Sequence, residues 1–342
     1  MVHYSDYLQL DKILDAQYPE SVRIGEPAHD ETLFIIIHQA YELWFKQLLH
    51  EASSVASILS QPVNDNSPQL QTVVHRLGRM TTILKLLVHQ IDVLETMTPM
   101  DFLDFRDLLR PASGFQSWQF KLLEARLGLS FADRHGQEYY ISQLREEHRT
   151  LIREAEMQPT IFALVNSWLE RMPFFEETAN WKHYGMEGSD GFWKEYQRIY
   201  TGSLADAEKA NTGHIEQILF ADRRGNAAIG DSKRKLSSAG CRAALFIMLY
   251  RGYPLLQLPF RLLNELLEID EQLSTWRYRH MNMVHRMIGT RIGTGGSTGK
   301  DYLRGAAEKH FIFAEIASLT SFLIERKKLP QLSRELEARL GF

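Results

Sequence analysis

Residues 273–289 read LSTWRYRHMNMVHRMIG, and this stretch decides the fold because its apolar residues recur at helical spacing without a break. The same pattern already runs from Leu258. The sequence therefore predicts one long helix from Leu258 to Ile288, ended by Gly289. His280 lies on the apolar face of this helix. The other members of that face are Leu273, Trp276, Met283, Val284 and Met287.

Two interpretations of His280 fit this position. A histidine on an apolar face needs partners for its ring nitrogens, and a lone one is more often a core residue bonded to a neighbour. The alternative is haem ligation, because an apolar site ringed by arginines suits a flat ligand with two propionates. The arginines near His280 in the sequence are Arg277, Arg279, Arg286 and Arg291. From this helix alone, both interpretations stay open.

Composition narrows the class of protein. The chain has 342 residues and a formal net charge of −4, so no basic excess favours nucleic-acid binding. Its single cysteine, Cys241, excludes an intrachain disulfide framework and is expected to be a packed core residue. The N-terminus lacks the pattern of a signal peptide, and the longest apolar run, Ala243 to Tyr250, is too short to span a bilayer. We expect a soluble, cytoplasmic protein.

Helical periodicity dominates the rest of the chain, and we find no alternating strand pattern. Thr98-Pro99-Met100-Asp101 reads as a helix start, with an N-cap, a proline at the first position and an acidic residue three after the cap. We expect one all-α domain over residues 1–342, with its core in 1–127 and 233–330 and a helical excursion at about 128–232. Other helices are predicted from Glu31 (Leu33, Ile37, Tyr41, Trp44, Leu48), from Leu70, and over Phe115–Leu127, Ile141–Glu156, Thr160–Met172 and Asp301–Ile324.

Three side chains outside the long helix are candidates for a binding site. Phe34 and His38 are four residues apart, so they share a helix face and could line an apolar pocket. Taken alone, a core helix with a hydrogen-bonded histidine explains this pair better. Arg106 stands among aromatic residues, where it either lies along the helix edge or binds a carboxylate beside an apolar pocket.

The glycine-rich segment Gly293–Gly299 does not fit a phosphate-binding motif. Lys300 is followed by Asp301 rather than Ser or Thr, and the segment follows a helix rather than a strand. Such a segment can close over a small polar ligand, although it can also be an ordinary connection between helices. The sequence has no HExxH pattern and no serine nucleophile elbow, so histidines, aromatics and one arginine favour cofactor chemistry.

Five segments together resemble the tryptophan 2,3-dioxygenase family of haem enzymes, and the similarity is closer to animal-type members than to shorter bacterial ones. The segments occur in family order and are spread over most of the chain. Only about 128–232 matches loosely, and the stretch after Pro330 is uninformative. They are Tyr4–Leu8, His29–Gln47, Phe105–Asp107 with Pro111–Ser117, Trp276–His280, and Gly293–Ser297.

The resemblance implies a role for each matching residue. His280 would be the axial ligand of haem b, active as Fe²⁺, and His38 the distal histidine that faces the indole N–H. Arg106 would bind the substrate carboxylate, and Thr294 the amino-acid head group. Ser113 matches a distal-side serine near the haem. Further residues that match the substrate pocket are Tyr4, Tyr7, Leu8, Phe34 and Phe102.

Two departures from the family pattern are visible. Position 102 is tyrosine in some bacterial members, so Phe102 removes a possible hydroxyl contact and the carboxylate would depend more on Arg106. Ser297-Thr298-Gly299 replaces a pair of serines found in many members, a minor change.

The implied fold is a haem-binding helical bundle, and the implied reaction opens the indole ring of L-tryptophan with both atoms of O2 to give N-formyl-L-kynurenine. The implied assembly is a homotetramer in which Tyr4 and Tyr7 reach a neighbouring subunit's site. Two alternatives remain: a relative that inserts one oxygen into tryptophan or a substituted tryptophan, and a haem or tryptophan sensor without turnover.

Overall fold

The computed structural model describes residues 1–135, 137–221, 234–293 and 300–341. The structure is 74% helical, and no strand occurs in these four ranges. The α-helices are α1 (Tyr4–Leu8), α2 (Leu10–Leu14), α3 (Glu20–Arg23), α4 (His29–Leu59), α5 (Pro68–Leu94), α6 (Pro99–Arg106), α7 (Trp118–Leu127), α8 (Gln137–Ser142), α9 (Glu146–Glu156), α10 (Ile161–Glu170), α11 (Ser189–Ser203), α12 (Asn211–Phe220), α13 (Ser238–Leu249), α14 (Pro254–Ile288), α15 (Lys300–Lys309), α16 (Ala314–Ser318) and α17 (Arg334–Arg339). Short 3-10 helices are η1 (Asp107–Leu109), η2 (Gly114–Gln116), η3 (Phe131–Asp133), η4 (Thr178–Glu187), η5 (Asp206–Glu208), η6 (Leu319–Phe322) and η7 (Arg326–Lys328).

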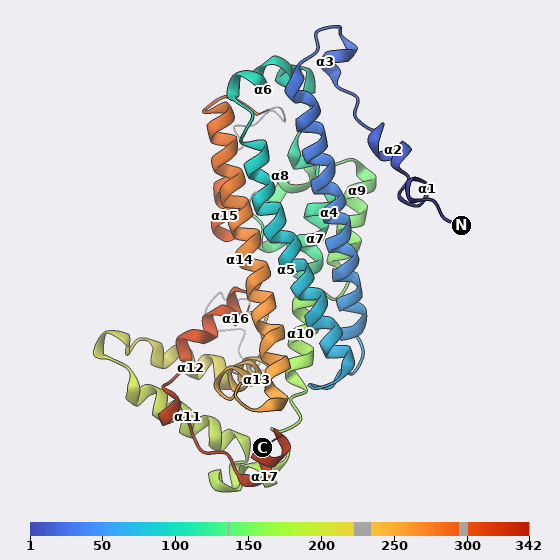
Figure 1. The fold of residues 1–342 in the computed structure, drawn as a ribbon. Helices are drawn as coiled ribbons and strands as arrows, with labels where there is room; N and C mark the ends of the chain where they lie inside the picture. Colours follow the sequence, from blue (N-terminus) through green and yellow to red (C-terminus); the bar gives the residue numbers. More distant parts are fainter. Residues whose placement is uncertain (136, 222–233, 294–299, 342) are drawn as a thin grey trace.

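Three long helices, α4, α5 and α14, form the body of the molecule (Figure 1). Helix α5 packs along both α4 and α14, and α7 covers the other side of α4. The smaller helices α10–α13, α16 and α17 gather at one end of this body. The long helices thus provide a rigid frame, and the predicted histidines lie on two of them, α4 and α14.

Local signals explain where these helices begin and end. The Ser67 side chain accepts a hydrogen bond from the Leu70 N–H at the start of α5. Thr98 and Asp101 form the predicted capping box of α6, since each side chain accepts a backbone N–H of the other. Gly289 has a φ of 57°, which favours glycine and ends α14 where the sequence predicts.

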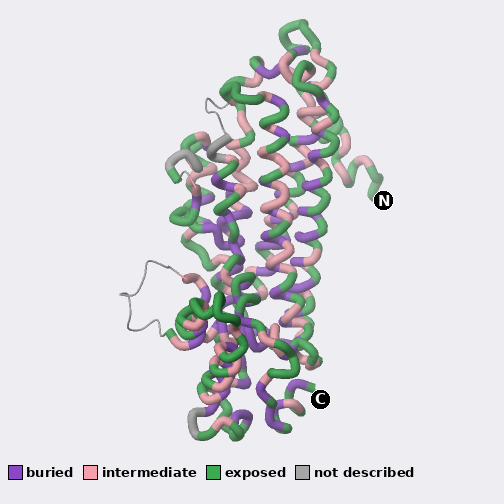
Figure 2. Tube along the Cα trace, turned by 90° about the vertical axis from the view of Figure 1, so that its left-hand side faces the viewer, coloured by how far each residue is buried: buried purple, intermediate pink, exposed green. Residues whose placement is uncertain are grey.

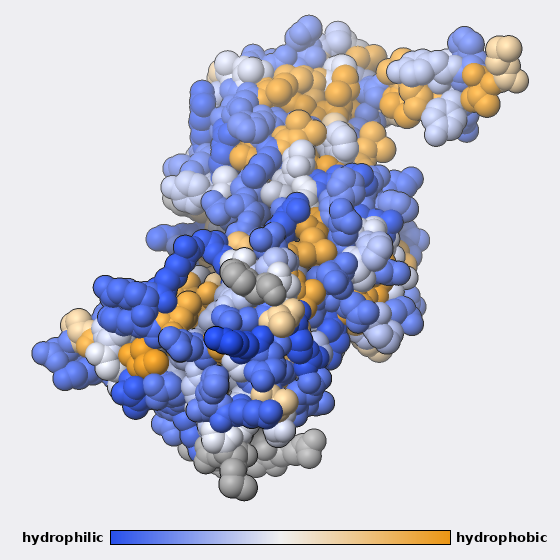
Figure 3. Space-filling model, turned by 60° about the horizontal axis from the view of Figure 1, so that its bottom comes forward, coloured by the Kyte–Doolittle hydropathy of each residue, from blue (hydrophilic) through white to orange (hydrophobic). Residues whose placement is uncertain are grey.

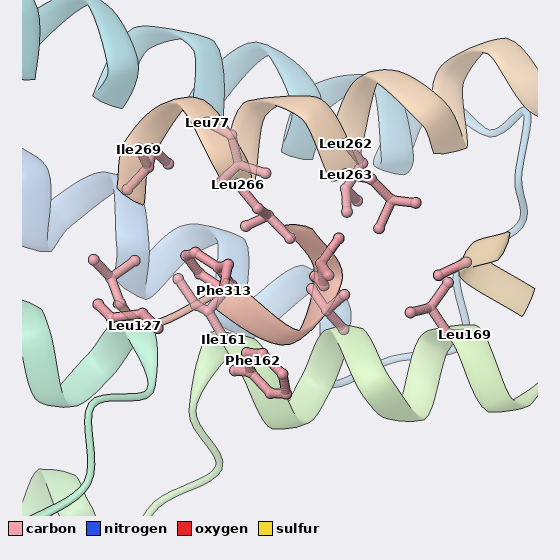
Figure 4. Close-up of a cluster of buried hydrophobic side chains, with 14 of the residues drawn as sticks. Leu77, Leu127, Ile161, Phe162, Leu169, Leu262, Leu263, Leu266, Ile269 and Phe313 are labelled. Carbon is pink, nitrogen blue, oxygen red and sulfur yellow. The ribbon is translucent and has the colours of Figure 1, made fainter. Parts of the chain in front are cut away.

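The core continues from the long helices into the small-helix end. Leu77 of α5, Leu266 of α14 and Phe313 meet Leu127 and Ile161 in one cluster (Figure 4). Figure 2 shows buried residues along the inner faces of the long helices and also within the small-helix end. Cys241 is buried, as predicted for a packed core residue.

Some predicted helix details are wrong. Trp44 is 36% exposed, because the buried face of α4 runs through Phe45 in its place, whereas Ile37, Tyr41 and Leu48 are buried as predicted. The helix predicted over Asp301–Ile324 is interrupted after Lys309. The backbone N–H groups of Ile312 and Phe313 donate to the buried Asp270 carboxylate rather than to a helical carbonyl, and this contact explains the break.

Two more predicted helices are each divided. The Ser113 hydroxyl accepts the Phe115 N–H at the start of η2, and extended backbone at Ser117 separates η2 from α7. The helix predicted over Ile141–Glu156 is divided between α8 and α9 by extended backbone at Arg145.

The first 14 residues extend away from the body (Figure 1). Helices α1 and α2 bury no residue, and large apolar side chains stay exposed along this segment. Figure 3 shows these apolar side chains on the projecting segment and others on the adjoining body. The exposed ones include Val2, Tyr4, Tyr7, Ile13 and Leu14.

No helix within the described ranges is both long and apolar enough to cross a membrane.

Candidate functional site

His280 lies in the second half of α14 and packs against an indole. Its ring is parallel to that of Trp276, one helical turn earlier, with an interplanar angle of 2° and centroids 5.1 Å apart. Leu273, Met283 and Met287 on the same helix are buried, as the periodicity predicts. Burial lowers the pKa of His280 to about 4, so its imidazole is neutral near pH 7. A neutral imidazole is the form that binds a metal.

His38 lies on α4 with a defined tautomer. Its Nδ1 is 2.7 Å from the Phe34 carbonyl oxygen, and a carbonyl only accepts, so Nδ1 carries the proton. Burial is the main cause that lowers the pKa of His38, which keeps it neutral. The neutral ring then presents Nε2 as an acceptor, suited to an N–H donor such as an indole.

His38 and His280 interact electrostatically. The His38 side chain is exposed to solvent, yet the protein atoms around it are close enough to lower its pKa. A charge on His38 also lowers the pKa of His280, so the two rings lie within electrostatic reach.

Aromatic packing joins the two helices that carry the histidines. Trp276 of α14 meets Tyr41 of α4 edge-on, with ring centroids 6.1 Å apart, and Phe45 in the same way at 6.5 Å. The Tyr41 hydroxyl donates to the Leu87 carbonyl of α5 at 2.9 Å. The stack behind His280 is therefore held by α4 and α5.

Phenylalanines form an apolar wall beside His38. The Phe34 ring lies 4.1 Å from the His38 ring between centroids and 5.7 Å from that of Phe102. Phe105 is 1% exposed and packs behind both phenylalanines, at 5.6 and 5.4 Å. Phe34 and Phe102 are predicted from the sequence as site residues, whereas Phe105 is not. Phe105 lies three residues after Phe102 on the same helix, and this spacing could have identified it as a neighbour of Phe102.

Arg106 is buried at the end of α6, with 4% of its surface exposed. Its Nη2 donates to the Ile292 carbonyl, directly before Gly293, and its Nη1 lies 3.7 Å from Asp107. Within the described residues its Nε has no hydrogen-bond partner. A buried guanidinium with a free donor beside an apolar wall can bind a carboxylate, so this position agrees with that interpretation of Arg106.

Other predicted site residues lie elsewhere or are not described. Thr294 and the rest of the glycine-rich segment through Gly299 fall outside the described residues. Ser113 is half-buried, and its hydroxyl accepts the Phe115 N–H. Tyr4, Tyr7 and Leu8 lie on the projecting segment, where Tyr4 and Tyr7 are 72% and 74% exposed. Their placement away from the body does not bring them to this chain's own histidines.

The predicted ring of arginines around His280 needs correction. Arg277 pairs with buried Glu124 at 2.7 Å, so its guanidinium points to α7. Arg279 pairs with Asp92 of α5 at 2.7 Å and with Glu95, the C-cap residue of α5, at 2.9 Å. Protein carboxylates therefore take the place of the expected propionates for these two arginines. The difference arises because buried or nearby carboxylates of α7 and of the α5 end lie within reach of these two guanidinium groups.

The lowered pKa of His280 predicts acid sensitivity of the haem-free chain. Above pH 6.5 this ring is neutral whether folded or unfolded, so it has no effect there. As pH falls from 6.5 towards 4, the histidine of the unfolded chain binds a proton while the native ring stays neutral. The free energy of unfolding therefore falls by at most about 3 kcal/mol. The free energy of unfolding, measured with denaturant at pH 7 and at pH 5, should fall less between these pH values in His280→Gln than in the unmodified chain. Equal losses would contradict the neutral native state.

Comparison with known proteins gives one family. The family model described as tryptophan 2,3-dioxygenase matches residues 1–323. A protein of Bdellovibrio bacteriovorus named tryptophan 2,3-dioxygenase is 44% identical, over 100% of this chain and 98% of its own length. Proteins of the same name from Dictyostelium discoideum and Mus musculus are 41% and 38% identical. These alignments cover 100% and 96% of this chain, and 88% and 84% of the relatives. The similarity is therefore continuous across the histidine-bearing helices.

Proposed function

This chain belongs to the tryptophan 2,3-dioxygenase family, and we propose that it opens the indole ring of L-tryptophan with O2. Both oxygen atoms would enter one product, N-formyl-L-kynurenine, as the first step of tryptophan catabolism by the kynurenine pathway. The observation that carries this proposal is the full-length similarity to relatives of that name, from bacterial to animal. The pair of neutral histidines on α4 and α14 supports it independently.

The residues near His280 fit haem b. Its imidazole is neutral, the Trp276 ring orients it, and its helix face is apolar, as a haem ligand requires. We propose His280 as the axial ligand, with iron in the Fe²⁺ state during turnover. The haem iron would supply the binding and activation of O2.

The substrate would lie between the His38 ring and the phenylalanine wall. His38 would accept the indole N–H at Nε2 and thereby orient the ring, without acting as a base. Phe34 and Phe102 would pack on the indole and exclude water. Arg106 would bind the carboxylate, and Phe102 in place of tyrosine removes one possible hydroxyl contact to it. These contacts place the indole C2–C3 bond for reaction, which is a positioning contribution.

Three further assignments follow the family pattern. Thr294 would meet the amino-acid head group, and Ser113 would lie near the haem. Tyr4, Tyr7 and Leu8 would enter a neighbouring site of a homotetramer, which the exposed apolar side chains of the projecting segment support. Sedimentation mass of the native chain tests this assembly.

Two broader expectations also stay as proposals. One continuous hydrophobic core that includes residues of 128–232 supports treating residues 1–342 as a single domain. A cytoplasmic location is the second, and cell fractionation tests it.

Isotope labelling tests the reaction. The reduced, haem-loaded protein is mixed with L-tryptophan and ¹⁸O2, and the product mass is measured. We expect two labelled oxygens in one ring-opened product. One labelled oxygen on an intact indole skeleton would instead support the monooxygenating alternative. Bound tryptophan that perturbs the haem spectrum without any product would support a sensor.

A further inference from the structure

A buried ionic cluster lies one helical turn from His280, outside the substrate site. Its centre is Glu124 of α7, which is 3% exposed. One carboxylate oxygen accepts Arg277 at 2.7 Å, and the other accepts Arg134 at 2.5 Å. These two arginines hold the pKa of Glu124 well below its usual range against the opposing effect of burial, so the carboxylate stays charged. The cluster is therefore a permanent ionic contact in the core.

Arg277 connects three parts of the fold. While Nη2 binds Glu124 of α7, Nη1 donates to the His310 carbonyl, directly after α15, at 2.9 Å. The His310 ring is itself fixed, because its Nε2 accepts the His135 N–H at 2.9 Å. Arg277 on α14 is thus bound to α7 and to the end of α15 at once.

Arg279 holds the same turn of α14 from the other side. It bridges Asp92 of α5 and the C-cap residue Glu95, but its side chain is 29% exposed and that of Asp92 is 57% exposed. Solvent screens such a pair, so it contributes little. The Arg277 contacts are buried, where loss of one partner leaves an uncompensated charge. Of the two, the buried contact is the one that can fix the helix.

We propose that Arg277, held by Glu124, is a positioning residue that fixes the turn of α14 carrying His280 and so sets the orientation of the axial imidazole. This inference rests on the proposed haem ligation by His280. Trp276, Arg277 and His280 lie within one helical turn, so a contact that holds Arg277 also restrains the backbone that carries His280. Trp276 supports the imidazole ring directly, whereas Arg277 acts through the backbone of that turn.

The test compares two buried variants with an exposed control in the haem-loaded protein. Glu124→Gln keeps the shape and removes the charge, whereas Arg277→Lys keeps the charge and removes the two-pronged contact. Arg279→Lys is the matched control on the exposed side. The readouts are the iron–histidine stretching band of the ferrous protein, the rate of haem loss, and kcat and KM for tryptophan.

We expect the iron–histidine band to shift or broaden in both buried variants, and haem loss to be roughly tenfold faster. An effect of charge alone would change these readouts in Glu124→Gln and leave them unchanged in Arg277→Lys, so a common effect in both variants indicates positioning. The KM should change little while kcat falls, because the substrate contacts are intact. The control should resemble the unmodified protein in all readouts.

A lower melting temperature with an unchanged band and unchanged haem loss would overturn the proposal and leave a structural role only. Arg277→Lys keeps a cation in the core, so it decides the question if Glu124→Gln does not fold. Absence of an iron–histidine band in the unmodified protein would instead contradict the ligand assignment in the proposed function, which separates the two failures.

Discussion

His280→Ala is expected to leave the purified protein almost free of haem. The His280 imidazole provides the only bond proposed between the chain and the haem iron. Its loss should lower the haem content from about one per chain to a small fraction and abolish turnover. Absorbance of the haem band relative to protein, after gel filtration, measures this effect.

His38→Ala is the matched control for haem retention. It removes the second neutral histidine but not the proposed ligand, so haem should stay bound while the kcat/KM for tryptophan falls. Added imidazole should restore part of the haem binding to His280→Ala, because the cavity left by the side chain can accept it. Normal haem content in His280→Ala would show that another residue binds the iron.

The frame of the fold could be predicted from the sequence because its signals are local. The helical pattern around His280 and the glycine at 289 define α14, and the capping box at Thr98 defines the start of α6. The break after Lys309 was not predictable in this way. The break depends on Asp270, which is 42 residues from Ile312 in the sequence and whose carboxylate accepts the Ile312 backbone N–H. Contacts between distant segments override local helical propensity at such points.

The site was predictable to the extent that side chains share a helix face. Phe34 and His38 contact each other as their four-residue spacing implies. The tautomer of His38 follows from the same spacing, since a helical imidazole reaches the carbonyl four residues earlier. In contrast, the partners of Arg277 and Arg279 come from α7 and α5, so the closeness of these arginines to His280 in the sequence did not reveal their partners.

Arg106→Ala is expected to weaken tryptophan binding more than any other change in the substrate pocket. Truncating one partner of a buried charged pair costs about 2–4 kcal/mol, which corresponds to a roughly 30- to 900-fold fall in kcat/KM, mostly through KM. Phe102 offers no hydroxyl to compensate. Steady-state kinetics with L-tryptophan measures the fall. The kcat/KM of Arg106→Lys should lie between those of the unmodified protein and Arg106→Ala, because lysine keeps the charge but not the planar guanidinium.

Arg106 also holds the Ile292 carbonyl, so a change in the backbone before Gly293 could weaken binding without any contact to the carboxylate. Tryptamine separates these causes, because it has the indole and the amine but no carboxylate. If Arg106 binds the carboxylate, its removal should cost tryptophan far more affinity than tryptamine, as measured by perturbation of the haem spectrum. Equal losses for both ligands would assign Arg106 to holding the chain at Ile292, and unchanged tryptophan affinity would exclude it from the site.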